Sequence, residues 1–195
     1  MSAKSALLES VRKELIRSAK GAHTLDHTIR VYTLSMTLCE GLKVNKRVLE
    51  AAALLHDIGR SKEEETGISH SLVSGEIGGR ILRNLGYEES EIRCVTESIR
   101  THRFSERLEP TSIEGQILSD ADKLDAIGAI GIYRAIAQAV ASERGIDGFL
   151  KHADEKLLKL HELMYTTKAR LIAEDRHGFL ESFVNRLREE TRSTH

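Results

Sequence analysis

Apolar residues recur at steps of three and four positions along nearly the whole chain, which is the spacing of amphipathic α-helices. Leu7, Leu8, Val11 and Leu15 give the first example. No stretch alternates apolar and polar residues for long enough to predict a β-strand. The composition agrees, because the 195 residues include only one proline and 4% aromatic residues. The chain is rich in strong helix formers such as Ala, Leu, Glu, Lys and Arg. We therefore predict an all-α fold, a compact helical bundle.

Glycines and capping residues divide this pattern into elements. A first amphipathic helix ends before Gly21, and a second ends near Gly41. The segment 60–67 is expected to be a charged loop, and Ser69 is expected to cap the helix that follows it. We predict one domain over residues 1–195, with a core at about 21–141 on which helices at 149–190 pack. The remaining helices are expected at 48–56, 69–85, 88–102, 113–141, 149–164 and 166–188.

The charge balance weighs against a polymeric nucleic acid or an anionic membrane as a partner, because 29 basic residues face 30 acidic ones. No apolar run approaches the ~20 residues that span a bilayer. The first twenty residues carry charges throughout and lack the apolar centre of a signal peptide. We expect a cytoplasmic protein, in which Cys39 and Cys94 are buried thiols.

The segment AAALLHDIG places two polar residues, His56 and Asp57, directly after five apolar ones. If this helix is buried, both side chains must be hydrogen-bonded or bound to an ion. Adjacent residues inside a helix point about 100° apart, but at a helix end the backbone can turn both toward one ion. The alternatives are a structural His–Asp hydrogen bond and an aspartate that caps the next turn.

Two other segments offer ligands of the same kind. His27 lies among apolar residues on the preceding predicted helix, where a histidine that serves only the core is the alternative. Asp122 lies in LSDADKLDAIG, an apolar helix in which charges are costly to bury unless they are paired or bind a metal. His27, His56, Asp57 and Asp122 would supply four protein ligands and leave positions for water and substrate.

These residues resemble the motifs of the HD superfamily, whose pattern is His, then His-Asp, then Asp. His27 with Arg30-Val31 is similar to the first His and its trailing Arg-Val, and HDIG, which begins at His56, is similar to the name-giving doublet. Asp122 in Ala-Asp-Lys-Leu is similar to the last ligand. The resemblance spans about 21–131, and within the superfamily it is strongest to small stand-alone hydrolases with ISHSLVSGEI- and IRTHRF-like segments.

The resemblance implies a helical bundle that encloses a divalent ion (Mn, Fe, Zn, Ni, Co or Mg) and acts as a phosphohydrolase. The implied reaction cleaves a phosphate ester or anhydride of a nucleotide, or of a similar small phosphorylated metabolite, by a metal-activated water. Asp57 would bind the ion and also orient or deprotonate the water.

His70 and His102 fall between the doublet and the final Asp, where branches of the superfamily with two metals carry additional histidines. We expect them to bind a second ion or to hydrogen-bond a substrate phosphate. Exposed histidines at helix ends are the alternative.

Cations near the ligands are candidates for phosphate contacts, because phosphoryl transfer depends on positioning and charge neutralisation. Lys123 is the first choice, since it follows Asp122 in an apolar helix, and a salt bridge to a neighbouring aspartate is its alternative. Arg60, Lys62 and Arg103 are weaker candidates. For Arg60 and Lys62, solvated surface charge is the favoured alternative.

Two functions of other classes stay open. A di-iron oxygenase of the same superfamily would require His70 and His102 to bind a second iron. A non-catalytic sensor would keep the fold and bind a nucleotide. The apolar seam on the last two helices could mediate a homodimer or pack on the domain.

Overall fold

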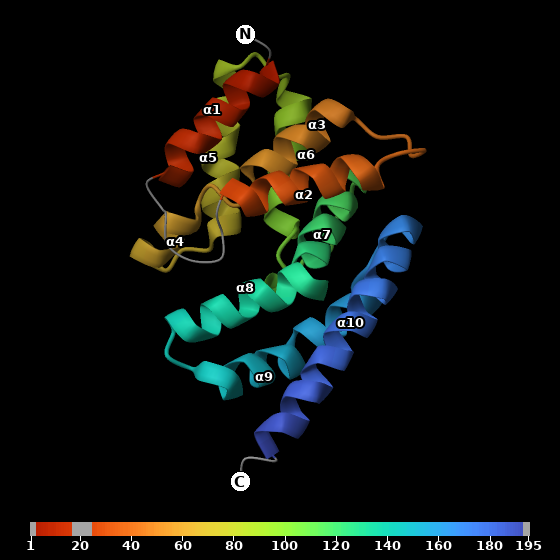
Figure 1. Ribbon diagram of the computed structural model, residues 1–195. Coiled ribbons are helices and arrows are strands. Elements are labelled where there is room, and N and C mark those ends of the chain that lie inside the picture. Colours follow the sequence, from red (N-terminus) through yellow and green to blue (C-terminus); the bar gives the residue numbers. More distant parts are fainter. Residues whose placement is uncertain (1–2, 17–24, 193–195) are drawn as a thin grey trace. The chain divides into compact units, whose positions relative to one another are not determined.

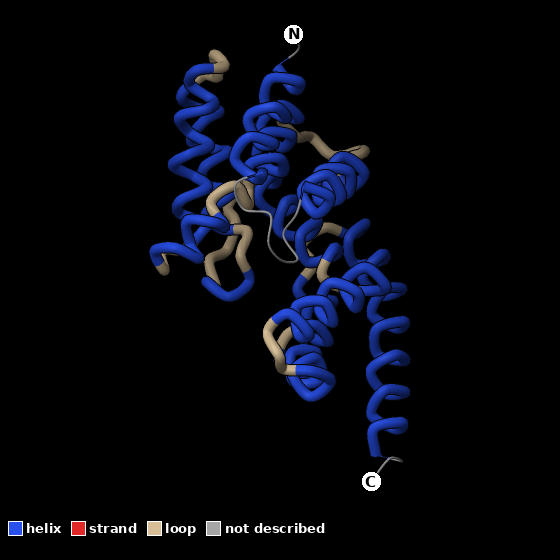
Figure 2. Tube along the Cα trace, turned by 60° about the vertical axis from the view of Figure 1, so that its left-hand side comes forward, coloured by secondary structure: helices blue, strands red, loops and turns tan. Residues whose placement is uncertain are grey.

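Within the described part of the chain, residues 3–16 and 25–192, the computed structural model contains helices and loops but no strand (Figure 2). The all-α prediction is therefore confirmed. The predicted break at Gly21 lies outside the described residues. The helices are α1 (Ala3–Ile16), α2 (Leu25–Leu38), α3 (Lys46–Leu55), α4 (Arg60–Thr66), α5 (His70–Asn84), α6 (Glu89–Thr101), α7 (Ile113–Asp125), α8 (Gly128–Ala141), α9 (Gly145–Glu155) and α10 (Thr167–Arg192), with short 3₁₀ segments η1 (Phe104–Glu106) and η2 (Leu157–Leu163).

The chain forms two compact units, of which the first ends at Ala121 and the second begins at Asp122. In the first unit, α3 packs against α1, α2 and α6, and α5 packs against α6 (Figure 1). The segment from Ala51 to Leu55 is buried on every side, as its unbroken apolar run predicts. Asn45 caps the start of α3, because its side chain accepts hydrogen bonds from the backbone amides of Arg47 and Val48.

In the second unit, α8, α9, η2 and α10 pack on one another (Figure 1). Their core includes Phe149, whose ring meets that of Phe183 edge to face at 6.0 Å, together with the buried Leu160, Leu180 and Val184. Of the apolar residues predicted as a seam on the last helices, Leu157 and Leu160 are buried, whereas Leu163, Leu171 and Phe179 are exposed. One domain over residues 1–195 stays a prediction.

The prediction of a loop at 60–67 is wrong, because residues Arg60–Thr66 form α4. Glu and Lys are good helix formers. Contacts of Glu63 with His70 and Arg103 hold this short helix against the first unit in place of an apolar stripe. It ends at Gly67, which adopts the left-handed φ of 73° and returns its N–H to the carbonyl of Glu63. As predicted, Ser69 caps the helix that follows.

The prediction of one helix over 113–141 is also wrong, because the chain breaks between α7 and α8. Gly128 has a φ of 72°, which a glycine adopts at little cost and which interrupts the α-helical path. A Cβ there would lie 3.0 Å from the side chain of Arg176. The helix predicted at 149–164 is likewise divided, since α9 ends at Glu155 and η2 follows Lys156.

Both cysteines are free, with Cys39 buried and Cys94 half-buried. Among the described residues no single helix is both long enough and apolar enough to cross a membrane, although the bent pair Ile113–Asp125 and Gly128–Ala141 reaches the required length and composition together.

Candidate metal centre

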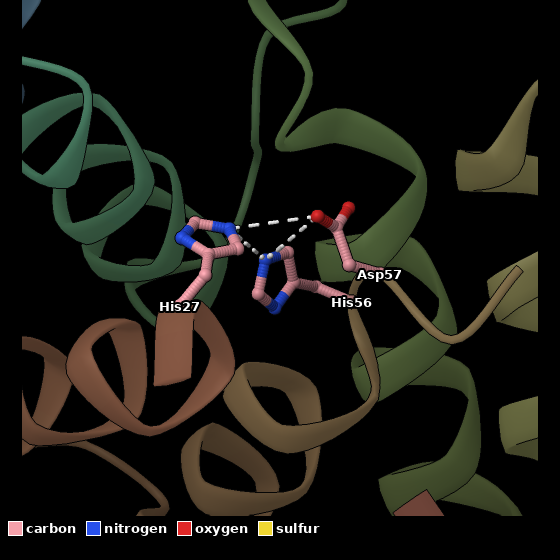
Figure 3. Close-up of side chains that lie close together, drawn as sticks. All are labelled: His27, His56 and Asp57. Atoms are coloured by element: carbon pink, nitrogen blue, oxygen red, sulfur yellow. Dashed lines mark hydrogen bonds and ion pairs between the residues drawn. The ribbon is translucent and has the colours of Figure 1, made fainter. Parts of the chain in front are cut away.

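Three predicted ligands meet inside the first unit (Figure 3). His27 comes from the first turn of α2, and His56 and Asp57 follow the last turn of α3. Nε2 of His27 lies 3.5 Å from Oδ2 of Asp57, and Nε2 of His56 lies 3.7 Å from the same oxygen. Both imidazoles are wholly buried, and Asp57 is 2% exposed. The cluster therefore holds two imidazoles and a carboxylate away from solvent.

The other oxygen of Asp57 faces a second pair of histidines. His70 is the first residue of α5, and His102 follows the last residue of α6. Nε2 of His70 lies 3.1 Å from Oδ1 of Asp57, and Nε2 of His102 lies 3.8 Å from it. Both histidines are buried, so the alternative of exposed histidines at helix ends is wrong. Asp57 thus belongs to two groups that could each hold a metal ion, one with His27 and His56 and one with His70 and His102.

Backbone carbonyls fix the protonation of two of these rings. Nδ1 of His56 lies 2.8 Å from the carbonyl oxygen of Ala53, and Nδ1 of His102 lies 2.5 Å from that of Ile99. Because a carbonyl oxygen only accepts, each Nδ1 carries the hydrogen and donates it. The neutral rings then keep their lone pairs on Nε2, the atom that faces Asp57. Metal-binding histidines are oriented in the same way.

The separations between these atoms fit a divalent ion. Bonds from such an ion to nitrogen and oxygen are about 2.0–2.2 Å long, which places two ligand atoms of one ion about 3–3.5 Å apart. Nε2 of His70 is buried and makes no hydrogen bond to any described residue, although Oδ1 of Asp57 is near. A lone pair aimed at a carboxylate oxygen is repelled unless a cation lies between them. The donor set therefore fits a metal ion at this place.

A close approach of backbones brings Asp57 to the start of α5. The amide of Gly59 donates to Oγ of Ser74, 2.9 Å away. A Cβ at position 59 would lie 2.7 Å from the backbone nitrogen of Ser74 and 2.9 Å from the backbone oxygen of His70. Only glycine at position 59 allows the backbone after His56 and Asp57 to lie this close to α5. Gly59 therefore helps to place Asp57 beside His70.

Asp122, the fourth predicted ligand, lies in the last turn of α7 and is the first residue of the second unit. Its part in the centre stays a prediction. Lys123 is 5% exposed, and its ammonium donates to the carbonyl of Leu163 at 3.0 Å and lies 4.5 Å from the centre of the Tyr165 ring. These contacts give Lys123 a place in the packing of the second unit, and its contact with a phosphate stays a prediction.

The three weaker cationic candidates differ in their surroundings. Nε of Arg60 lies 3.1 Å from Oδ1 of Asp57, which places a guanidinium at the edge of the cluster. Lys62 pairs with Glu65 on the exposed side of α4, as a solvated surface charge would. Arg103 donates from Nη1 to Glu63 at 2.6 Å, so its charge is engaged by a carboxylate.

Sequence reasoning missed Glu63, which accepts a hydrogen bond from Nδ1 of His70 at 2.8 Å. It is one of three consecutive glutamates in a segment without apolar periodicity. Nothing in the sequence distinguishes it from its neighbours, because the turn at Gly67 that brings it to His70 depends on α4 being a helix.

Residues 24–127 match the family model described as the HD domain. The chain belongs to the HD-domain family. Its match covers α2 to α7, the helices that carry all the predicted ligands. This HD protein is 35% identical to the uncharacterised protein YpgQ of Bacillus subtilis strain 168 over an alignment of 182 residues. The alignment covers 90% of this chain and 87% of YpgQ.

Solved structures of similar proteins have the same fold. The crystal structure of Bacillus subtilis YpgQ in complex with ADP superposes with a TM-score of 0.79 at 29% identity, over 96% of this chain and 94% of that one. An HD-superfamily hydrolase from Bacillus thuringiensis superposes with a TM-score of 0.77 at 34% identity, over 97% and 96% of the two chains. Similarity at this level extends beyond the HD motifs to nearly the whole chain.

Proposed function

We propose that this HD protein is a metal-dependent phosphohydrolase that cleaves a phosphate ester or anhydride bond of a nucleotide or a similar small phosphorylated metabolite. The observation that carries the proposal is the buried Asp57 carboxylate, which faces histidine Nε2 atoms on both of its oxygens. Arg60 lies beside one carboxylate oxygen, but it does not separate the imidazole Nε2 atoms from the carboxylate, so the cluster is best explained as a metal site.

Two comparisons support the choice of substrate class. A relative of nearly the same length and fold, YpgQ, has been crystallised with ADP. Another relative of the same fold is described as an HD-superfamily hydrolase. A nucleotide offers both the phosphate groups that a divalent ion binds and the anhydride bonds that a hydrolase cleaves.

The roles of the residues follow from their places. When bound, a divalent ion would supply a water of lowered pKa and positive charge for a phosphate oxygen. His27, His56 and Asp57 would hold it, with Asp122 as the fourth ligand, and His70 and His102 would hold a second ion with Asp57. Arg60, beside Asp57, would add positive charge at the edge of the centre, where a phosphate group would be neutralised.

The test uses full-length protein stripped of metal, reloaded with Mn²⁺, and assayed for release of phosphate or pyrophosphate from nucleoside di- and triphosphates. We expect bound metal and hydrolysis in the unaltered protein, and loss of both in Asp57→Ala. Asp147→Asn is the matched control, because this carboxylate is exposed at the start of α9. It should retain both properties.

Other results would count against the proposal. An unaltered protein that binds no metal after reloading with Mn²⁺, Zn²⁺ or Fe²⁺, yet binds ADP tightly, would indicate a non-catalytic nucleotide sensor. Hydrolysis that survives in Asp57→Ala would place the chemistry elsewhere in the chain.

A second candidate is a di-iron oxygenase, and one observation favours it. The carboxylate of Asp57 lies between two histidine pairs, an arrangement that suits two ions joined by one bridging ligand. Two irons per chain together with substrate-dependent oxygen uptake would establish it in place of the hydrolase. A protein that holds two irons per chain but takes up no oxygen would exclude the oxygenase.

A further inference from the structure

Glu63, in the first turn of α4, contacts the start of α5 with one carboxylate oxygen and the segment after α6 with the other. Oε2 accepts from Nδ1 of His70 at 2.8 Å, and Oε1 accepts from Nη1 of Arg103 at 2.6 Å. Arg103 in turn lies 3.4 Å from Glu106 on η1. Glu63 is half-buried, whereas His70 is wholly buried. The carboxylate therefore stands between solvent and a buried histidine, and an arginine holds it there.

This contact decides which nitrogen of His70 faces the metal centre. An ionised carboxylate only accepts hydrogen bonds, so Nδ1 of His70 carries a hydrogen, and in the neutral ring that binds a metal Nε2 keeps the lone pair. Nε2 is the atom that lies 3.1 Å from Oδ1 of Asp57. The guanidinium of Arg103, which donates to Oε1 at 2.6 Å, stabilises the ionised form of this carboxylate.

His70 differs in this respect from His56 and His102. Those two rings donate to backbone carbonyls, which are neutral and fixed by their helices. A charged acceptor raises the basicity of the ring opposite it more than a carbonyl does, and a basic imidazole is a stronger ligand. His70 is thus the ring of these three whose ligand strength depends on a side chain.

We propose that Glu63 is a positioning residue for an ion held by Asp57, His70 and His102. It fixes the tautomer of His70 and strengthens His70 as a ligand, so it sets the affinity of this position and leaves the position of His27 and His56 unaffected. The inference rests on the proposed function only in that the cluster binds metal.

Glu63→Gln tests whether Glu63 fixes the tautomer of His70. The side-chain amide has one oxygen, whereas Arg103 and Nδ1–H of His70 both need an acceptor. The guanidinium is charged and takes the oxygen, which turns the amide N–H₂ toward His70. Nδ1 must then accept, and the hydrogen moves to Nε2. In Glu63→Gln we therefore expect His70 to switch tautomer and to lose its lone pair toward Asp57.

The first readout is the tautomer of His70 in metal-free protein, taken from long-range ¹H–¹⁵N correlation spectra of ¹⁵N-histidine-labelled samples. We expect the Nδ1–H form in the unaltered protein and the Nε2–H form in Glu63→Gln. Glu64→Gln is the matched control, because Glu64 is the next residue of α4 and is exposed. It should leave the spectrum unchanged.

The second readout is Mn²⁺ binding, measured by calorimetric titration and by metal content after dialysis. The unaltered protein and Glu64→Gln should bind two ions per chain. In Glu63→Gln and Glu63→Ala one of the two ions should bind about 10–100-fold less tightly, while the other keeps its affinity.

The outcomes separate the inference from the proposed function. Two ions of unchanged affinity in the Glu63 variants would overturn the inference and leave the metal-dependent hydrolase standing. A protein that binds one ion would overturn the inference while the His27–His56–Asp57 position survives. A protein that binds none would overturn the metal site and the hydrolase as well. A tautomer of His70 that is the same in Glu63→Gln and in the unaltered protein would show that Glu63 does not fix it.

Discussion

Nε2 of His27 lies 3.2 Å from Nε2 of His56, so imidazoles from α2 and from the end of α3 face each other inside the first unit. Because Nδ1 of His56 donates to the carbonyl of Ala53, its Nε2 is an acceptor. His27 must meet this acceptor with a proton, or both nitrogens must meet a cation. The same nitrogens lie 3.5 and 3.7 Å from Oδ2 of Asp57, which favours the cation.

A divalent ion should therefore stabilise the folded protein. At an ion concentration one hundred times the dissociation constant, we expect the free energy of unfolding to rise by about 2.7 kcal/mol. Urea denaturation followed by circular dichroism, with and without Mn²⁺, measures the difference. Asp57→Ala should show no dependence on Mn²⁺, and Asp147→Asn should behave as the unaltered protein. An equal rise in Asp57→Ala would mean that Mn²⁺ acts at another place.

Gly59→Ala should damage both stability and metal binding. The added Cβ would meet the backbone atoms of Ser74 and His70 at 2.7 and 2.9 Å, and backbone atoms cannot step aside as a flexible side chain can. We expect a loss of about 1–3 kcal/mol in the free energy of unfolding, as for other overpacked sites. Displacement of Asp57 from His70 should also weaken Mn²⁺ binding, which calorimetric titration measures.

The control for this change is Gly178→Ala, also a glycine-to-alanine change. Gly178 lies within α10, and a Cβ there meets nothing within 4 Å. Alanine is the better helix former by up to about 1 kcal/mol, so this variant should be more stable than the unaltered protein. If Gly59→Ala were as stable as Gly178→Ala, the close approach to α5 would not constrain the doublet.

The sequence predicts helices well where an apolar stripe meets a core. Helices α5 and α6 lie where Ser69 and Glu88 predict their starts. Helix α4 was missed because its charged residues contact the core too little to leave a stripe. The break at Gly128 was missed because a glycine in an apolar helix is equally consistent with close packing, and only its φ of 72° distinguishes the two.

The predicted ligands are residues whose chemistry conflicts with their surroundings. His56 and Asp57 follow an apolar run, and a buried polar pair requires a partner that can be inferred without coordinates. Glu63 shows the opposite case, because a glutamate among glutamates conflicts with nothing nearby in the sequence. Its contact with His70 arises from the left-handed turn at Gly67, which a charge pattern does not record.

The network around Glu106 should make stability depend on pH. Partial burial raises the pKa of Glu106, but hydrogen bonds from Ser69 and Ser71 and the charge of Arg103 lower it below 4.5 overall. A carboxyl whose folded pKa is depressed adds stability above its unfolded pKa and loses that stability as the pH falls through its folded pKa. The stabilisation should therefore be complete at neutral pH and absent in acid.

Glu106→Gln tests this dependence. We expect it to lower the free energy of unfolding by about 1 kcal/mol at neutral pH, since a partly exposed charged hydrogen bond is screened by water. The difference from the unaltered protein should shrink as the pH falls through the folded pKa of Glu106, and vanish once this carboxyl is protonated. Glu109→Gln, an exposed glutamate nearby, should show no such difference. If the loss in the free energy of unfolding of Glu106→Gln did not depend on pH, the packing and neutral hydrogen bonds of Glu106, and not its charge, would account for the stabilisation.

Lys123→Met should separate the two roles considered for this lysine. Methionine keeps the length of the stem but removes the ammonium, so the carbonyl of Leu163 loses its hydrogen bond and the Tyr165 ring loses its cation. A buried hydrogen bond from a charged donor contributes about 1.5–3 kcal/mol, and we expect a loss of that size in urea denaturation. Mn²⁺ binding should be unchanged. If Lys123 only supports the second unit, kcat/KM for nucleotide hydrolysis should stay within about twofold below the unfolding transition. A fall of about 100-fold in kcat/KM in folded protein, which corresponds to the loss of about 2.7 kcal/mol of transition-state stabilisation, would instead assign the ammonium to a substrate phosphate.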